Sequence, residues 1–122
     1  MKIKEDLKNK SNVKENYLLI ITTTDKMEIA KRMVNALLNN KLIACAQIIN
    51  SRSFYWWNKT IQNSKEYLIL LKTKNRNYKI VEKVIKENHD YEIPEIIGVE
   101  IKKGSRDYFR WINSTLSKKK NK

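Results

Sequence analysis

The residues between Glu87 and Glu100, "ENHDYEIPEIIGVE", hold the chain's one histidine, its one proline, five carboxylates and no lysine or arginine. An imidazole is a good ligand for copper and zinc, and a thiolate binds soft metals such as Cu(I). His89 and the lone cysteine, Cys45, are therefore the candidate metal ligands, with Glu92 or Asp90 as the oxygen donor. A bound metal would be copper or zinc.

This ligand set is small for a dedicated metal centre. A closed structural zinc site uses four protein ligands, and the chain has no HxxxH pair and no EF-hand loop. Cys45 stands between Ala44 and Ala46 in an apolar segment, where a buried, inert side chain is the simpler interpretation. The acidic run can equally be a turn that leads into a strand, because Pro94 holds Ile93 extended. With no Ser/His/Asp set and no glycine-rich phosphate loop, we expect a binding protein and not an enzyme.

The charge of the chain does not by itself indicate a nucleic-acid partner. The formal net charge is +13, from 26 basic and 13 acidic residues. Lysine outnumbers arginine 21 to 5, and there are 14 asparagines, whereas phosphate-gripping domains favour arginine. We expect a solvated lysine surface with no specific nucleic-acid partner. Weak polyanion binding through that surface is the alternative.

Length and composition favour one soluble domain. A 122-residue chain can bury one core, and no apolar run is long enough to span a membrane. We expect a polar N-terminal tail at 1–16, a folded domain at 17–116 and a basic C-terminal tail at 117–122. The N-terminus has no hydrophobic signal core, which favours the cytoplasm. An organelle is the alternative if a leader precedes this sequence.

Hydrophobic periodicity predicts an α+β fold with the element order βαββαβ and a terminal helix. We expect strands at 17–24, 42–57, 65–73 and 95–101, with a turn at 58–64. Helices are expected at 77–88 and 105–116, the latter capped by Ser105. A further helix is expected to begin at a capping box of Asp25 and Glu28 and to end at Asn39–Asn40. This order gives a ferredoxin-like, four-stranded antiparallel sheet with both main helices on one face.

Two of the strands are apolar at every position, which bears on assembly. Residues 18–21 and 67–71 do not alternate, although one face of such a sheet should meet water. A second copy of the chain is the simplest cover for that face, so we expect an obligate oligomer. The alternative cover is the C-terminal helix. Consecutive rings at 54–57 indicate a hairpin arm gripped between subunits more than a platform that stacks nucleobases.

Five segments, taken together, resemble the CutA divalent-cation-tolerance proteins. They are "ACAQI" (44–48), "RSFYWW" (52–57) followed by "IQ" (61–62), "LLKT" (70–73), "HDYEIPEIIGVEI" (89–101) and "DYFRW" (107–111). They occur in the family's order and spacing, and the resemblance covers about residues 17–113. Three positions depart from the family pattern. Asp90 replaces a proline, Asn58–Lys59 replaces a glycine-containing hairpin tip and implies a longer or more mobile turn, and Gln47 stands where Asn is common.

The resemblance implies a homotrimer built like the PII signalling proteins, with a role in tolerance of copper and other divalent ions and no established catalysis. It implies a pocket between subunits that is lined by Cys45, Trp56, Lys72, His89, Tyr91, Glu92 and Glu95. We expect the trimer interface to include Tyr55, Trp57, Tyr108 and Trp111. A PII-like sensor that binds a small anion or metabolite beside Lys72 is the alternative function.

Overall fold

The computed structural model describes residues 16–117 and has the α+β architecture expected from the sequence. The strands and helices follow one another in the expected order. The strands are β1 (Tyr17–Thr24), β2 (Cys45–Trp57), β3 (Thr60–Lys74) and β4 (Ile96–Ile101), and the helices are α2 (Met27–Asn39), α3 (Tyr78–Asn88) and α4 (Arg106–Ser117), with a short 3-10 turn η1 (Asn75–Asn77) before α3. The two tails expected at the ends lie outside the described residues, apart from Asn16 and Ser117.

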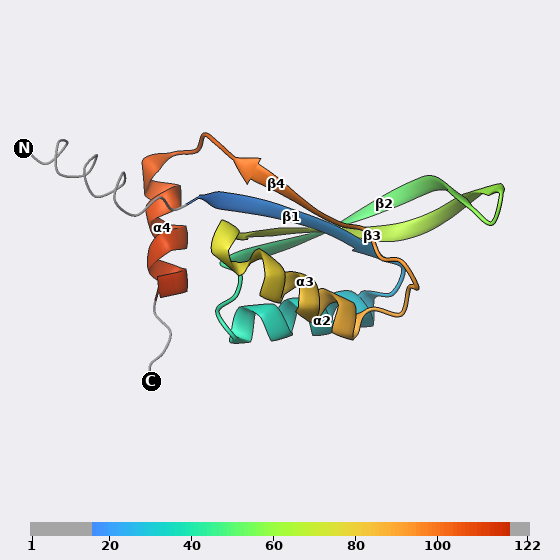
Figure 1. The fold of residues 1–122 in the computed structure, drawn as a ribbon, viewed down its shortest axis with the longest axis horizontal. Helices are drawn as coiled ribbons and strands as arrows, with labels where there is room; N and C mark the ends of the chain where they lie inside the picture. Colours follow the sequence, from blue (N-terminus) through green and yellow to red (C-terminus); the bar gives the residue numbers. More distant parts are fainter. Residues whose placement is uncertain (1–15, 118–122) are drawn as a thin grey trace, which may run out of the picture.

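The four strands form one antiparallel sheet in the order β2-β3-β1-β4. Figure 1 shows α2 and α3 side by side on one face of this sheet, while β2 and β3 continue past it as a twisted hairpin, here called the arm. The long β2–β3 pairing runs from Cys45↔Lys72 to Trp57↔Thr60. The sheet therefore has a compact body and one projecting end.

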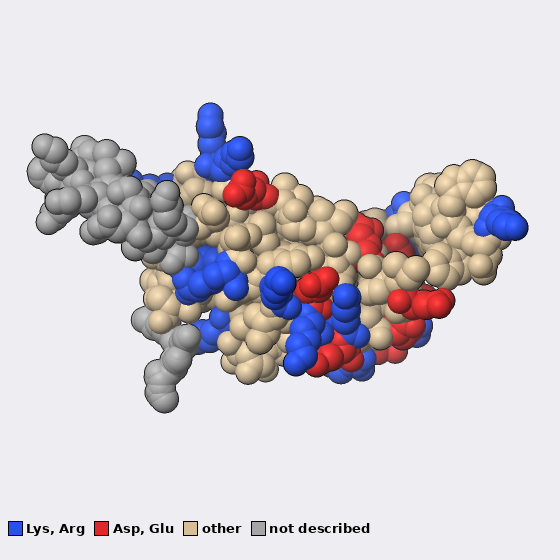
Figure 2. Space-filling model, viewed as in Figure 1, with Lys and Arg blue, Asp and Glu red and all other residues tan. Residues whose placement is uncertain are grey.

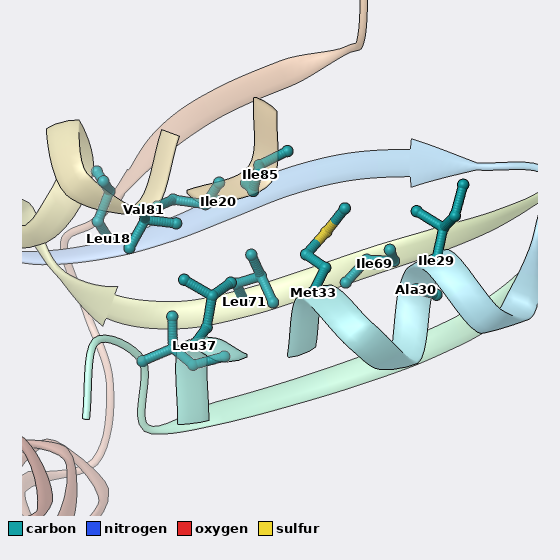
Figure 3. Packing of buried hydrophobic residues seen from close by; sticks show 11 residues of the cluster. Leu18, Ile20, Ile29, Ala30, Met33, Leu37, Ile69, Leu71, Val81 and Ile85 are labelled. Atoms are coloured by element: carbon teal, nitrogen blue, oxygen red, sulfur yellow. The ribbon is translucent and has the colours of Figure 1, made fainter. Parts of the chain in front are cut away.

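The core lies between the sheet and these two helices. Alternate residues of β1 and β3, such as Ile20, Ile69 and Leu71, are fully buried against Met33 and Leu37 of α2 and against Val81 and Ile85 of α3. Figure 3 shows these side chains meeting in one layer. Helical residues three and four positions apart share a face, so each helix presents one apolar stripe to the sheet.

The opposite face of the sheet has no such cover in the described chain. Because side chains alternate along a strand, the neighbours of the core residues point to the other side. Here this side is called the open face. It carries seven apolar residues, all half-buried or exposed: Leu19, Ile21, Ile49, Leu68, Leu70, Ile97 and Val99. The runs that do not alternate in sequence thus serve both faces, as expected.

The C-terminal helix does not provide the missing cover. α4 stands across one end of the sheet, where Ile112 and Leu116 pack with Ala44, Tyr17 and Phe109. Ile49, Ile97 and Val99 of the open face remain exposed.

Several local expectations are wrong in detail. The arm ends in a two-residue turn, with Trp57 paired to Thr60, and not in the longer turn expected at 58–64. Asn58 and Lys59 have φ of 50° and 66°, the left-handed pair that matches the twist of a hairpin. β2 begins at Cys45 and not at Leu42.

One end of α2 differs from expectation. Asp25 does not cap this helix, because the cap position is Lys26, whose side chain makes no capping hydrogen bond. The helix ends at Asn39 with Asn40 as its C-cap, as expected, and Lys41 follows in the left-handed region at φ 56°. Ser105 does cap α4 as expected, and its Oγ accepts a hydrogen bond from the Tyr108 amide at 3.1 Å.

The docking of α4 depends on a close approach at Gly104. The Phe109 ring stacks on Tyr17 of β1 with centroids 4.2 Å apart and planes 3° from parallel. A Cβ added at Gly104 would lie 2.6 Å from the Phe109 ring. Glycine is therefore needed here for space.

We predict that Gly104→Ala lowers the free energy of unfolding by about 1–3 kcal/mol, because the new methyl group pushes Phe109 off Tyr17. Gly98→Ala is the matched control, since its methyl group would meet the Tyr78 ring at 3.3 Å and needs only a small adjustment. Urea unfolding of both variants measures the difference. Equal stability of the two variants would show that the Phe109 contact does not hold α4.

Candidate functional site

The loop after α3 is held by His89. Its Nδ1 accepts a hydrogen bond from the Tyr91 amide at 3.1 Å, so Nε2 carries the proton and donates to the Thr23 carbonyl at 2.6 Å. The side chain is 1% exposed. Both ring nitrogens are therefore in use, and they join the loop to the end of β1.

Tyr91 links the same loop to β3. Its hydroxyl donates to Glu66 Oε2 at 2.5 Å, and Glu66 is only 6% exposed. Burial and the bonded Glu66 carboxylate raise the pKa of Tyr91, because both disfavour a second negative charge at the phenol oxygen. Tyr91 consequently remains a hydrogen-bond donor at neutral pH.

Further carboxylates surround this pair. Glu95 lies on the surface, and its pKa is raised by partial loss of hydration and then by the charge of Glu66. Asp25 is near enough for its charge to contribute to the raised pKa of Tyr91. Glu66, with Glu95 close to it and Asp25 close to its partner Tyr91, is here called the acidic pocket.

Asp90, the residue after His89, contacts a cation. Its Oδ2 accepts a hydrogen bond from Lys26 Nζ at 2.8 Å, and this bond lowers the pKa of Asp90. Lys26 also contacts Asp25 at 3.4 Å. The Asp90 carboxylate therefore ties the loop to the start of α2 and is already paired.

The other predicted site residues lie at the opposite end of the open face. Cys45 is directly across from Lys72 in the β2–β3 pairing, so the two side chains share this face. Lys72 Nζ donates to Gln47 Oε1 at 2.7 Å and lies 5.9 Å from the centre of the Tyr108 ring. Burial, followed by the neighbouring Cys45, raises the pKa of Tyr108. Cys45 is half-buried and, as the chain's one cysteine, forms no internal disulfide.

One subunit does not bring the predicted ligands together. Glu66 and Lys72 are six residues apart on β3, which is about 20 Å in a strand. His89 is near the first of these residues and Cys45 is near the second, while Glu92 is exposed on the loop. Within residues 16–117, no three His, Cys, Asp or Glu side chains are placed to hold a metal ion. The ligand set does not fit a metal within a single chain.

The aromatic residues assigned to the pocket and the interface are exposed on the single chain. Trp56 is 70% exposed on the arm and far from Lys72. Tyr55, Trp57, Tyr108 and Trp111 each keep a substantial part of their surface free. The pocket residues thus lie in separate places, namely the arm, the acidic pocket and the Cys45–Lys72 pair.

Sequence reasoning missed Glu66. Its side chain points to the open face in the same row as Leu68, Leu70 and Lys72. That alternation was readable in "KEYLILLKT", where a lone carboxylate falls on the apolar side. The partner of Glu66, Tyr91, is 25 residues away in sequence, and no local pattern predicts that contact.

Comparison with known proteins gives one consistent result. Residues 18–115 match the family model described as CutA1 divalent ion tolerance protein. The chain is 36% identical over 95 residues to the divalent-cation tolerance protein CutA of Pyrococcus horikoshii, covering 78% of this chain and 93% of that protein. It is also 33% identical over 100 residues to the chloroplastic protein CutA 1 of Oryza sativa, covering 80% of this chain and 56% of that one.

The fold agrees with a solved structure as well. The periplasmic divalent cation tolerance protein CutA of Archaeoglobus fulgidus superposes with a TM-score of 0.80 at 31% identity, covering 83% of this chain and 99% of that one. No helix within residues 16–117 is long and apolar enough to cross a membrane. Since relatives are named chloroplastic and periplasmic, the cytoplasmic location expected for this chain stays a prediction.

We predict that Tyr91→Phe lowers the free energy of unfolding by about 1–3 kcal/mol, because it leaves the buried Glu66 carboxylate without its hydrogen bond. Tyr78→Phe is the control, since its hydroxyl makes no hydrogen bond to any described residue while its ring packs on Gly98. Thermal unfolding at a fixed protein concentration measures both variants. A Tyr91→Phe variant as stable as Tyr78→Phe would mean that the bond contributes nothing.

Proposed function

The chain belongs to the CutA1 divalent ion tolerance protein family, and on that basis we propose that it acts in divalent-cation tolerance as a homotrimer that binds and does not catalyse. Its relatives are named for tolerance of divalent cations. We propose copper as the ion to which this tolerance applies. The site's residues offer one imidazole and one thiol, which suit recognition of a soft or borderline ion.

The observation that supports assembly is the open face. Each fully buried aliphatic side chain contributes about 1.5–3 kcal/mol, and the seven on this face are only half-buried or are exposed. A contiguous apolar surface on this scale is typical of an interface that persists between subunits. A second and a third copy of the chain would cover it.

The arm supports the same conclusion. Trp56 pairs with Ile61 across the hairpin, and both side chains are more than half exposed together with Phe54. Tyr55 and Trp57 alternate onto the other side of the arm. An isolated two-stranded arm has little core of its own, so a neighbouring copy is the natural contact for these rings. Tyr55, Trp57, Tyr108 and Trp111 are the interface residues that we propose.

A pocket between copies would reunite residues that are separate on one chain. We propose that Cys45 and Lys72 of one copy face His89, Tyr91, Glu92 and Glu95 of another, with Trp56 from an arm. His89 can ligate a metal through Nδ1 only if the Tyr91 amide releases that nitrogen, since Nε2–H is bonded to Thr23. A metal-binding imidazole commonly donates its other ring N–H to a carbonyl, as Nε2–H of His89 does here.

A second candidate function is a PII-like sensor of a small anion. It is favoured by Lys72, whose ammonium group contacts the neutral Gln47 and forms no ion pair with a described carboxylate. Such a group can receive a phosphate or carboxylate of a ligand. Weak polyanion binding by the lysine surface is a third candidate. Figure 2 shows basic and acidic side chains intermixed over α2 and α3, which does not favour it.

We predict that the wild-type chain sediments as a trimer that persists on dilution to low micromolar concentration, whereas Ile97→Lys yields monomer or aggregate, because a charge on the open face opposes its burial. Ile80→Lys is the control, since Ile80 on α3 is 47% exposed against 46% for Ile97 but lies on the helix side. A folded wild-type monomer, or equal behaviour of the two variants, would contradict the trimer.

We predict that copper or zinc binding, measured by calorimetry, weakens at least about tenfold in His89→Ala and in Cys45→Ser, because each removes one proposed ligand. Binding should also weaken as pH falls, since protons compete for imidazole and thiolate. Glu87→Gln, an exposed carboxylate change on α3, is the control. Equal affinity in all these proteins would place any metal elsewhere and favour the sensor function.

A further inference from the structure

Glu66 is a buried carboxylate that forms no ion pair with a basic residue of the described chain. Its Oε2 is bonded to the neutral Tyr91 hydroxyl, and its Oε1 has no hydrogen-bond or ion-pair partner among the described residues. Residues of this kind are almost never fully buried unless they are paired. Tyr91 stabilises the charge by one hydrogen bond but does not neutralise it.

Carboxylates close to Glu66 add further negative charge that is not neutralised. Glu95 precedes β4 in the same alternating row as Ile97 and Val99 of the open face, and no ion pair joins it to a basic residue within residues 16–117. Asp25 is paired with Lys26, which also serves Asp90. The acidic pocket therefore holds two carboxylates, Glu66 and Glu95, that lack a basic partner within residues 16–117.

The position of the acidic pocket connects it to assembly. Glu66 continues the open-face row of Leu68 and Leu70 toward the arm. Figure 2 shows acidic side chains at the base of the arm, next to its largely uncharged surface. Whatever covers the open face therefore removes the remaining water from these carboxylates as well.

Removing that water has a definite energetic consequence. An unpaired carboxylate loses its hydration when an interface closes over it, and the loss is recovered only if a cation with good hydrogen-bond geometry replaces the water. Lys72 lies on the open face and forms no ion pair with a described carboxylate, so another copy offers a cation on the surface that would meet this one. Charge complementarity thus favours a second copy of this chain as the occupant.

We infer that a lysine or arginine of a neighbouring copy enters the acidic pocket and bonds to Glu66 and Glu95, so that the pocket is complete only in the assembled protein. This inference rests on the proposed trimer and adds to it a polar contact at the edge of an apolar interface. The cation fixes the register in which one copy meets the next, because an apolar face alone permits sliding.

The test compares charge-neutralising variants of equal size. Glu66→Gln and Glu95→Gln remove the charge but keep the volume, and Glu87→Gln makes the same change at an exposed position on α3. Trimer melting is followed by circular dichroism, and subunit release by native mass spectrometry. We expect the melting temperature to fall by at least about 5 °C in the first two variants and to change by less than about 2 °C in the third.

Three outcomes would overturn the inference while leaving the trimer intact. A wild-type trimer whose Glu66→Gln and Glu95→Gln variants melt at or above the wild-type temperature would show that no partner cation is present. Equal losses in all three variants would show a general charge effect. Stability that falls on adding EDTA and returns with Mg²⁺ or Ca²⁺ would assign the neutralising role to a metal ion. A wild-type monomer would instead refute the proposed function itself.

Discussion

Two helices can cover only one face of a four-stranded sheet, and most of this molecule's properties follow from that limit. The covered face closes the core with Ile20, Ile69, Leu71 and their helical partners. The other face is almost as apolar, because β1 and β3 alternate between two sets of aliphatic residues. Neither α4 nor the arm turns back over it. This open face is the basis of the proposed assembly, in which the proposed site lies at the contacts between copies.

The polar residues of the open face lie at its two ends. Lys72, Gln47 and Cys45 lie near α4, while Glu66, Glu95, Tyr91 and His89 lie where the arm leaves the body. The cationic Lys72 and the anionic Glu66 are thus six positions apart on β3, which is about 20 Å in a strand. In a cyclic assembly the surface at one end of each copy can meet the other end of the next. The separation therefore favours heterologous contacts, in which unlike surfaces meet, over like-to-like pairing.

The fold was largely predictable from the sequence because hydrophobic periodicity is a local property. "YLLIITTT" predicted β1 to the residue, and Ser105 was correctly identified as a cap. Errors arose where backbone conformation decides the outcome. The left-handed residues were Asn58, Lys59 and Lys41, and lysine carries no signal for that region.

The site was less predictable, since its contacts span the chain. His89 bonds the Thr23 carbonyl across 66 positions, and Tyr91 bonds Glu66 across 25. A backbone carbonyl has no signature in a sequence. Residue type alone therefore suggested a metal ligand at His89, where the structure has an imidazole that holds two segments together.

The strand order determines which strand pairs can form early during synthesis. β2 and β3 are joined by two residues and pair from the turn outward, so every contact between them is close in sequence. β1, by contrast, lies between β3 and β4, and its Tyr17↔Ile101 pair joins the first strand to the last. During synthesis the hairpin can therefore form well before the central strand acquires its second neighbour. Until residue 101 has left the ribosome, β1 has one free edge, and the last strand to be made completes the sheet.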